Sequence, residues 1–368
     1  MIHNTSSRHS SAQPCPPATA NIPVIDLAGD EADVARQLVA AAEDHGFIYI
    51  KNRGNDIPAA AVDEAFSLSR RIFDTPLEEK QRCSIQTNNR GWTGMHAETL
   101  DPKNQRSSVL LCHLHEEERL ANSQAGRAFN FGEFVDGKAQ QPIPSTIAAE
   151  EARFAAFADS CRRLCHKILY LLGLGLDVGD FFSSAHFTTQ SGSGTILPPA
   201  PTSAPAPTPT TAPSRCSSAS PARAGLEVLR RDNVWAPVPV SPPGTAADPS
   251  PPILVNIGDL LSYWTNGLFR STVHRVVFPA EGSGAAVEGE SSSGPRYSIA
   301  FFCHPVGTTR LEPVPSQKVK DYVPAGEAVS ANPYAERKVM TADEHLFMRL
   351  KESYGTLYDE KKEDGSKS

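Results

Sequence analysis

Residues 253–277 read ILVNIGDLLSYWTNGLFRSTVHRVV, and this stretch sets the expected fold. Its first five residues predict a buried strand that ends at the Gly258-Asp259 turn. The apolar run from Leu260 to Trp264 predicts a continuation of that strand, and Thr265-Asn266-Gly267 predicts a further turn. Residues 271–277 then predict another strand, so strands dominate this part of the chain.

Outward from this stretch, the pattern changes from antiparallel strands to a mixture of helices and strands. The clearest helical pattern covers 151–172, where apolar residues recur at steps of three and four. A C-terminal helix is predicted over 341–356, with Thr341 as its cap. Further strands are predicted at 22–27, 47–50, 226–229, 234–238 and 297–302. This order favours an α+β fold in which a β-barrel or sandwich carries helices on one side.

Composition narrows the class of protein. The 368 residues carry a net charge of −7, which argues against non-specific binding to nucleic acid and against a basic membrane-surface protein. The sequence has no apolar run of about 18 residues, so no membrane-spanning helix is expected. The seven cysteines include no C-x-x-C pair, and the N-terminus lacks the apolar stretch of a secretory signal. A reducing, cytoplasmic location follows as the prediction.

Four segments depart from regular patterns. Residues 1–20 are polar and predict a disordered tail, and residues 280–295 predict a surface loop. Residues 107–127 interrupt an otherwise continuous pattern and predict an atypical insert. In residues 198–221, 22 of 24 are Pro, Ala, Ser or Thr, and eight are proline. Because proline donates no hydrogen bond, this tract is predicted to supply no strand and to form a disordered insert.

Three side chains in the second half of the chain could share a binding cavity. His274 lies on one face of its predicted strand, and Arg296 and Ser298 lie on one face of the later strand. A neutral imidazole suits Fe(II), while a guanidinium fork and a hydroxyl suit a carboxylate. The alternative is a core histidine and a surface arginine, and spacing alone does not decide between the two.

Ordered motifs resemble the isopenicillin N synthase-like family of Fe(II)- and 2-oxoglutarate-dependent dioxygenases. The catalytic half is matched by N-x-G-D at 256–259, T-N-G at 265–267, S-T-x-H-R-V at 271–276 and R-Y-S at 296–298. The N-terminal half is matched by Ile22-Pro23-Val24-Ile25-Asp26-Leu27, His45-Gly46-Phe47 and Gly91-Trp92-Thr93-Gly94. The resemblance covers about residues 21–106, 128–186, 225–315 and 341–356.

The resemblance implies a double-stranded β-helix, or jelly roll, flanked by helices. It implies Fe(II), 2-oxoglutarate and O2 as reactants with a small molecule of specialised metabolism, leading to hydroxylation, desaturation or ring closure. His274 would be a metal ligand, and Arg296 and Ser298 would bind the far carboxylate of 2-oxoglutarate. The expected divisions are a tail at 1–20, an N-terminal region at 21–135, a catalytic region at 151–315 and a C-terminal segment at 316–368.

One family motif is missing. Two further iron ligands form H-x-D in the family, between the long helix and the strand at 226–229, but this sequence contains no H-x-D. His186 is the only histidine in that interval, and a low-complexity insert at 187–224 is predicted to replace core strands. His96-Ala97-Glu98 and His115-Glu116-Glu117 have H-x-E spacing, although a solvated surface is the simpler interpretation of both.

Three explanations remain for the missing motif. The coding sequence across 186–225 could be read out of frame or mis-spliced, as the Pro/Ala/Ser/Thr bias suggests. The protein could be a true inactive member that at most binds a ligand or partner, or iron could be held by unexpected ligands. The expectation is therefore a dioxygenase-family oxidoreductase with an incomplete metal site, and whether this chain is an active enzyme stays open.

Overall fold

The structure is a computed structural model that describes eight stretches of the chain. These are residues 19–85, 90–93, 113–117, 127–186, 214–219, 225–276, 296–323 and 338–353. For 113–117, 127, 214–219, 276, 296 and 350–353 it describes the backbone alone. The predicted tail at 1–20, apart from its last two residues, and the loop at 280–295 lie outside these stretches, as does the His96–Glu98 motif.

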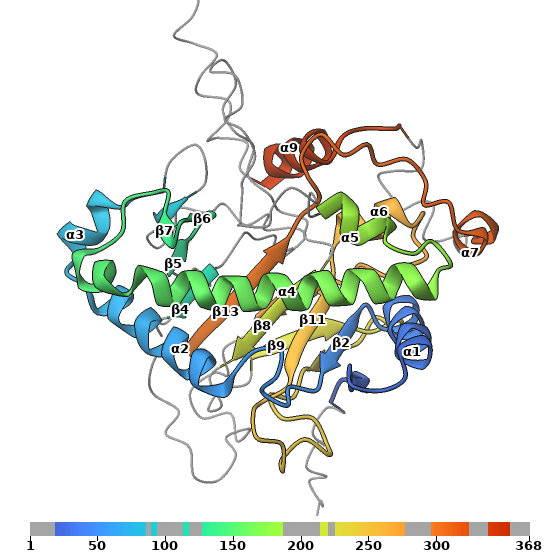
Figure 1. Cartoon of the computed structure of the whole chain (residues 1–368), viewed down its shortest axis with the longest axis horizontal. Helices are drawn as coiled ribbons and strands as arrows, with labels where there is room; N and C mark the ends of the chain where they lie inside the picture. The colour runs from blue at the N-terminus through green and yellow to red at the C-terminus, as the bar shows by residue number, and fades with distance from the viewer. Residues whose placement is uncertain are drawn as a thin grey trace, which may run out of the picture.

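Both helices and strands occur along the described residues (Figure 1). The helices are α1 (Glu31–Asp44), α2 (Ala59–Asp74), α3 (Leu77–Arg82), η1 (Ser145–Glu150), α4 (Glu151–Gly175), α5 (Phe181–His186), α6 (Asp259–Trp264), α7 (Gln317–Asp321) and α9 (Ala342–Ser353). The strands are β1 (Val24–Ile25), β2 (Phe47–Ile50), β3 (Gly91–Thr93), β4 (His113–Glu117), β5 (Arg127–Asn130), β6 (Phe134–Val135), β7 (Lys138–Ala139), β8 (Ser214–Ala219), β9 (Leu226–Leu229), β10 (Trp235–Pro237), β11 (Ile253–Ile257), β12 (His274–Val276) and β13 (Arg296–Cys303).

A large sheet joins the two halves of the chain. Its eight strands run in the order β1-β2-β11-β8-β13-β4-β5-β3. β2, from the N-terminal half, pairs antiparallel with β11, with Ile253 opposite Ile50. The regions predicted at 21–135 and 151–315 therefore share one sheet. A smaller sheet has the order β10-β9-β12.

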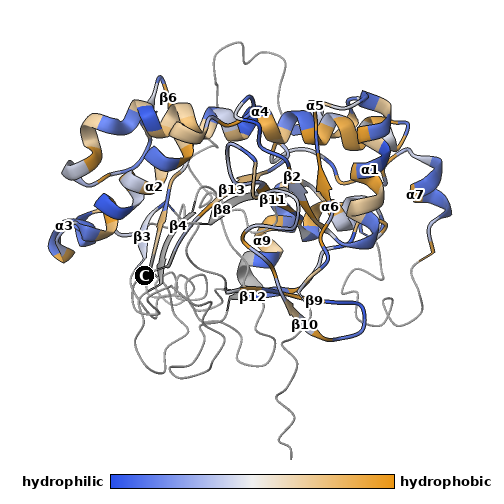
Figure 2. Ribbon diagram, turned by 90° about the horizontal axis from the view of Figure 1, so that it is seen from below, coloured by the Kyte–Doolittle hydropathy of each residue, from blue (hydrophilic) through white to orange (hydrophobic). Residues whose placement is uncertain are grey.

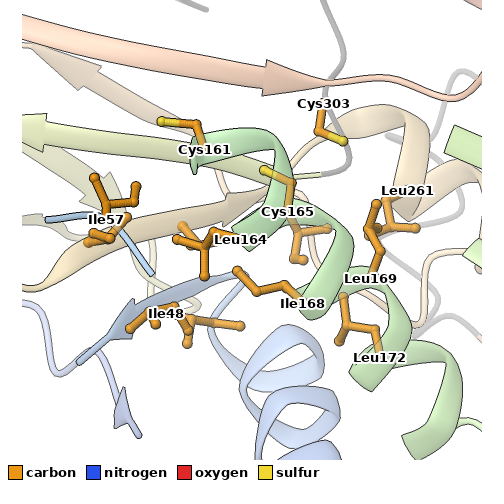
Figure 3. Packing of buried hydrophobic residues seen from close by; sticks show 14 of the residues in the cluster. Ile48, Ile57, Cys161, Leu164, Cys165, Ile168, Leu169, Leu172, Leu261 and Cys303 are labelled. Atoms are coloured by element: carbon orange, nitrogen blue, oxygen red, sulfur yellow. The ribbon is translucent and has the colours of Figure 1, made fainter. Parts of the chain in front are cut away.

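The helix-side face of the large sheet packs against α4, which crosses its strands (Figure 1). Alternate residues of β2, β11 and β13 contribute to this core, as Ile253, Val255 and Ile257 of β11 do. The predicted apolar stripe of α4 is confirmed, because Cys161, Leu164 and Cys165 are buried, and Cys165 lies near Cys303 (Figure 3). None of the described helices combines the length and apolar character needed to cross a membrane.

The opposite, inner face of the large sheet packs against the small sheet. Figure 2 shows helices, large sheet and small sheet as successive layers. Alternate residues of β2 and β11 point into this second core, which joins both sheets. Its members are Ala20, Ile22, Phe47, Tyr49, Val228, Ala236, Val238 and Leu254. Two packed sheets with helices outside one of them match the predicted jelly roll flanked by helices.

The prediction that residues 198–221 supply no strand was wrong. Residues 214–219 form β8, which pairs antiparallel with both β11 and β13 in the middle of the large sheet. The eight prolines of the tract all lie outside this segment, at 198–213 and at 221. Every residue of β8 therefore keeps its N–H donor, and the average composition of the tract concealed a proline-free strand.

Two further segments differ from the expectation. Residues 113–117, inside the predicted insert at 107–127, form β4 between β13 and β5. Leu260 to Trp264 belong to α6 and do not continue the β11 strand. A short apolar run fits a buried strand and a buried helix equally well by periodicity, and here Gly258 precedes the first turn as its N-cap.

Candidate functional site

His274 points into the space between the two sheets. It begins β12 and lies opposite Val228 of β9. Directly opposed residues of an antiparallel pair present their side chains on the same face, and Val228 belongs to the inner core. The imidazole also meets the edge of the Phe47 ring, with 5.4 Å between ring centroids. The register and the ring contact agree, so the predicted metal ligand faces the interior of the jelly roll.

The imidazole of His274 is held in one tautomer. Its Nδ1 lies 3.0 Å from the backbone carbonyl oxygen of Thr272. Because a carbonyl oxygen can only accept a hydrogen bond, Nδ1 must carry the proton. In the neutral ring this leaves the lone pair on Nε2, which is the nitrogen that can bind a metal. A carbonyl partner of this kind commonly orients metal-ligating histidines.

The segment before His274 is fixed against the end of α1. The backbone N–H of Arg270 donates to the carbonyl of Ala42, 2.9 Å away. The hydroxyl of Thr272 donates to the carbonyl of His45, 2.7 Å away. Gly46 follows with φ of 66°, and a Cβ placed there would lie 2.1 Å from the carbonyl oxygen of Arg270. Only glycine lets the two segments approach this closely.

A substitution at Gly46 tests this close approach. Gly46→Ala should reduce the free energy of unfolding by about 1–3 kcal/mol more than Gly54→Ala does, because of overpacking. Gly54 is the matched control, since its φ is 86° and a Cβ there would meet nothing within 4 Å. Urea denaturation of both variants measures the difference. Equal losses would show that Arg270 and Gly46 are not in close contact.

Ser298 lies on the inner face of β13. Tyr297, Ile299 and Cys303 belong to the helix-side core, so the alternate residues point the other way. Ser298 is among these, and its side chain is buried. Arg296 begins the same strand opposite Glu117, but its side chain lies outside the described residues. His274 and Ser298 therefore come from different sheets and face the same interior.

Asn256 is a polar inner-face residue that the sequence reasoning did not assign to the site. It lies opposite Phe47 in the β11–β2 pair, and Phe47 contacts His274. Its side chain is buried, and the bond that its amide nitrogen makes, to the carbonyl of Ile257, is long at 3.5 Å. A single asparagine in an otherwise apolar strand was the signal that could have identified it.

The described residues do not complete an iron site around His274. They contain no group of three or more His, Cys, Asp or Glu side chains able to hold a metal ion. The sequence from 187 to 225, which should bear the other ligands, has no histidine, aspartate or glutamate. A non-haem Fe(II) site of the facial-triad kind takes two histidines and one carboxylate. The described side chains therefore do not supply this donor set around His274.

His186 does not substitute for a missing ligand. It ends α5 and packs at a tilt near Trp264, with ring centroids 6.2 Å apart, in the core on the helix side of the large sheet. Burial lowers its pKa to about 4, and its Nδ1 donates to the carbonyl of Phe182 at 2.5 Å. The second H-x-E motif lies in β4, with His115 opposite Ser298. The side chains of β4 are outside the described residues, so its role stays a prediction.

Two family models match this sequence. The first, described as the N-terminal domain of non-haem dioxygenases in morphine synthesis, matches residues 22–130. The second, the 2OG-Fe(II) oxygenase superfamily, matches residues 198–305. Together they cover more than half of the chain, and the second match includes β8.

Full-length relatives and solved structures agree with these matches. The UPF0676 protein of Schizosaccharomyces pombe is 29% identical over 83% of this chain and 89% of its own length. A 2-oxoglutarate-dependent dioxygenase of Epichloe uncinata is 26% identical over 82% and 87%. A 2OG-Fe(II) oxygenase family protein of Caulobacter crescentus shares the fold with a TM-score of 0.60 and 24% identity, over 91% of this chain and all of that one. A full-length Neurospora crassa protein, solved in complex with alpha-KG, aligns with a TM-score of 0.59 and 20% identity, over 89% and 95%.

Proposed function

Because this chain belongs to the isopenicillin N synthase-like family of Fe(II)- and 2-oxoglutarate-dependent oxygenases, we propose that His274, Arg296 and Ser298 are its remaining cofactor-binding residues. The family function is oxidation of a small molecule, with Fe(II) and 2-oxoglutarate as cofactors. In this proposal His274 contributes one metal ligand, Arg296 and Ser298 bind the oxoacid, and the metal site of this chain is incomplete.

One observation supports this proposal above the others. His274 on the small sheet and Ser298 on the large sheet face the same interior, although 24 residues separate them in the sequence. The hydrogen bond from Nδ1 of His274 to the Thr272 carbonyl is the arrangement that commonly orients metal-ligating histidines, which supports the assignment. Ser298 is buried, and its hydroxyl suits the carboxylate of an oxoacid.

Arg296 tests the oxoacid half of the site. Arg296→Lys keeps the positive charge but loses the planar fork, so it should weaken 2-oxoglutarate binding by about 1–3 kcal/mol. Isothermal titration of the whole chain with 2-oxoglutarate measures this loss. Arg310→Lys is the matched control, because Arg310 is an exposed residue paired with Glu312. Unchanged binding in Arg296→Lys would exclude Arg296 from the oxoacid site.

A non-catalytic member of the family is the competing proposal. Such a protein would bind 2-oxoglutarate, another small molecule or a protein partner without oxidising anything. The described residues contain no complete set of metal-ligating side chains, which favours this alternative. Iron content after anaerobic loading, together with succinate formation, separates the two. Substoichiometric iron and no succinate would support the binding protein, and stoichiometric iron with succinate would support the enzyme.

The partners proposed for this chain are a small-molecule substrate and O2, with neither nucleic acid nor membrane. Gly91–Thr93 of β3 and the residues at 280–295 are proposed to contribute to substrate contacts, on the sequence pattern alone. A cytoplasmic location is also proposed. Cys83, Cys161, Cys165 and Cys303 are buried and form no disulfide among the described residues.

A further inference from the structure

The C-terminal helix α9 is built into the body of the protein. A capping box starts it, because the Thr341 N–H donates to the Glu344 carboxylate and the Glu344 N–H donates to the Thr341 hydroxyl. Ala342, His345 and Leu346 are buried on its inner side. This helix is therefore docked by its first two turns, and a charged residue further along, Arg349, faces the same way.

Arg349 and Ser271 bind the two oxygens of one carboxylate. The Arg349 guanidinium donates to Oδ2 of Asp259 at 2.5 Å, and its side chain is only 11% exposed. The Ser271 hydroxyl donates to Oδ1 of the same Asp259, also at 2.5 Å. Asp259 is the first residue of α6, so this carboxylate joins α9, α6 and the segment that leads into β12.

Ser271 lies next to the residue that orients His274. The carbonyl of Thr272 accepts the hydrogen bond from Nδ1 of His274, as described above. That peptide is held from one side by the Thr272 hydroxyl on His45 and from the other by Ser271 on Asp259. Residues 271–273 belong to no strand, so few backbone hydrogen bonds hold them. The side-chain bonds of Ser271 and Thr272 therefore fix their position.

We propose that Asp259 is a positioning residue that couples the C-terminal helix to the imidazole of His274. Arg349 binds one oxygen of the Asp259 carboxylate, and the other oxygen holds Ser271. The carbonyl of the adjacent Thr272 then fixes the orientation of the His274 imidazole. The functional meaning of this coupling rests on the proposed role of His274 as a metal ligand. The coupling itself needs neither metal nor oxoacid, and thermodynamic linkage requires it to act in both directions.

Amide hydrogen exchange of the whole chain, without metal or oxoacid, tests the coupling. Arg349→Leu should accelerate exchange several-fold in peptides that cover 268–276 and leave peptides of α2 unchanged. Arg82→Leu is the matched control, because Arg82 forms an exposed pair with Glu78 on α3. This control should leave exchange unchanged both in peptides that cover 268–276 and in peptides of α2. Acceleration confined to α9 in Arg349→Leu would overturn the proposal.

Ser271→Ala provides the reciprocal test and removes only one hydroxyl, so it keeps the test decisive if Arg349→Leu unfolds. It should accelerate exchange in 342–353 as well as in 268–276. Ser271→Thr keeps the hydroxyl, so both segments should exchange at the rate of the unmodified chain. Unchanged exchange in 342–353 for Ser271→Ala would contradict the coupling. Because 2-oxoglutarate binding is measured separately, a failure of the coupling leaves the proposed function standing, and the reverse also holds.

Discussion

Replacing residues 187–224 with a family segment that carries an H-x-D motif and its following strand should raise Fe(II) affinity by orders of magnitude. The chain as written offers His274 but no other assigned protein donor, so we expect it to bind Fe(II) weakly and to turn over no substrate. Each protein ligand must displace a tightly bound water and stay deprotonated, which makes several preorganised donors necessary. Anaerobic titration with Fe(II) measures the affinity of both proteins.

The control for this gain is His274→Ala in the replaced chain. It should abolish the increase in affinity, because the new histidine and carboxylate then lack their third partner. An unmodified chain that holds one Fe(II) per molecule and converts 2-oxoglutarate to succinate would refute the missing-ligand argument. The next residues to substitute with alanine would then be His96 and Glu98.

Ser217→Pro should reduce the free energy of unfolding by at least about 3 kcal/mol, because it breaks the ladder in a central strand. Ser217 lies in β8, opposite Leu254 of β11 and Ala300 of β13. Ser203→Pro is the matched control, since it adds one proline to the stretch that already contains seven. Thermal unfolding of the two variants measures the contrast. Equal melting temperatures would mean that β8 does not contribute to the folded state.

Deletions give the same contrast on a larger scale. Removing 198–221 should sharply reduce the yield of folded protein, because it removes β8 from between two strands. Removing only 198–213 should change the free energy of unfolding by roughly 0.6 kcal/mol, since closure entropy varies slowly with loop length. A disordered insert would tolerate both deletions, whereas the pairing of β8 with β11 and β13 separates them.

Local sequence patterns predict most of the helices and strands of the fold. The helix at 151–172 and the strands at 47–50, 226–229 and 234–238 follow from short-range periodicity, and the structure confirms them. The inward direction of Ser298 also follows from alternation along a single strand. The ordered motifs from Asn256 to Ser298 were enough to indicate the family.

The pairing of strands that lie far apart in the chain could not be predicted from the sequence. SRCSSA at 214–219 has little strand propensity of its own, and its place in the sheet depends on β11 and β13, which come much later in the chain. The bond from Arg349 to Asp259 joins residues 90 apart in the same way. The sequence by itself determined the family, the main helices and strands, and the candidate residues His274, Arg296 and Ser298. The tertiary structure alone decided that β8 completes the sheet, that residues 260–264 form a helix, and that His274 and Ser298 face one interior, because these depend on which surfaces meet across the fold.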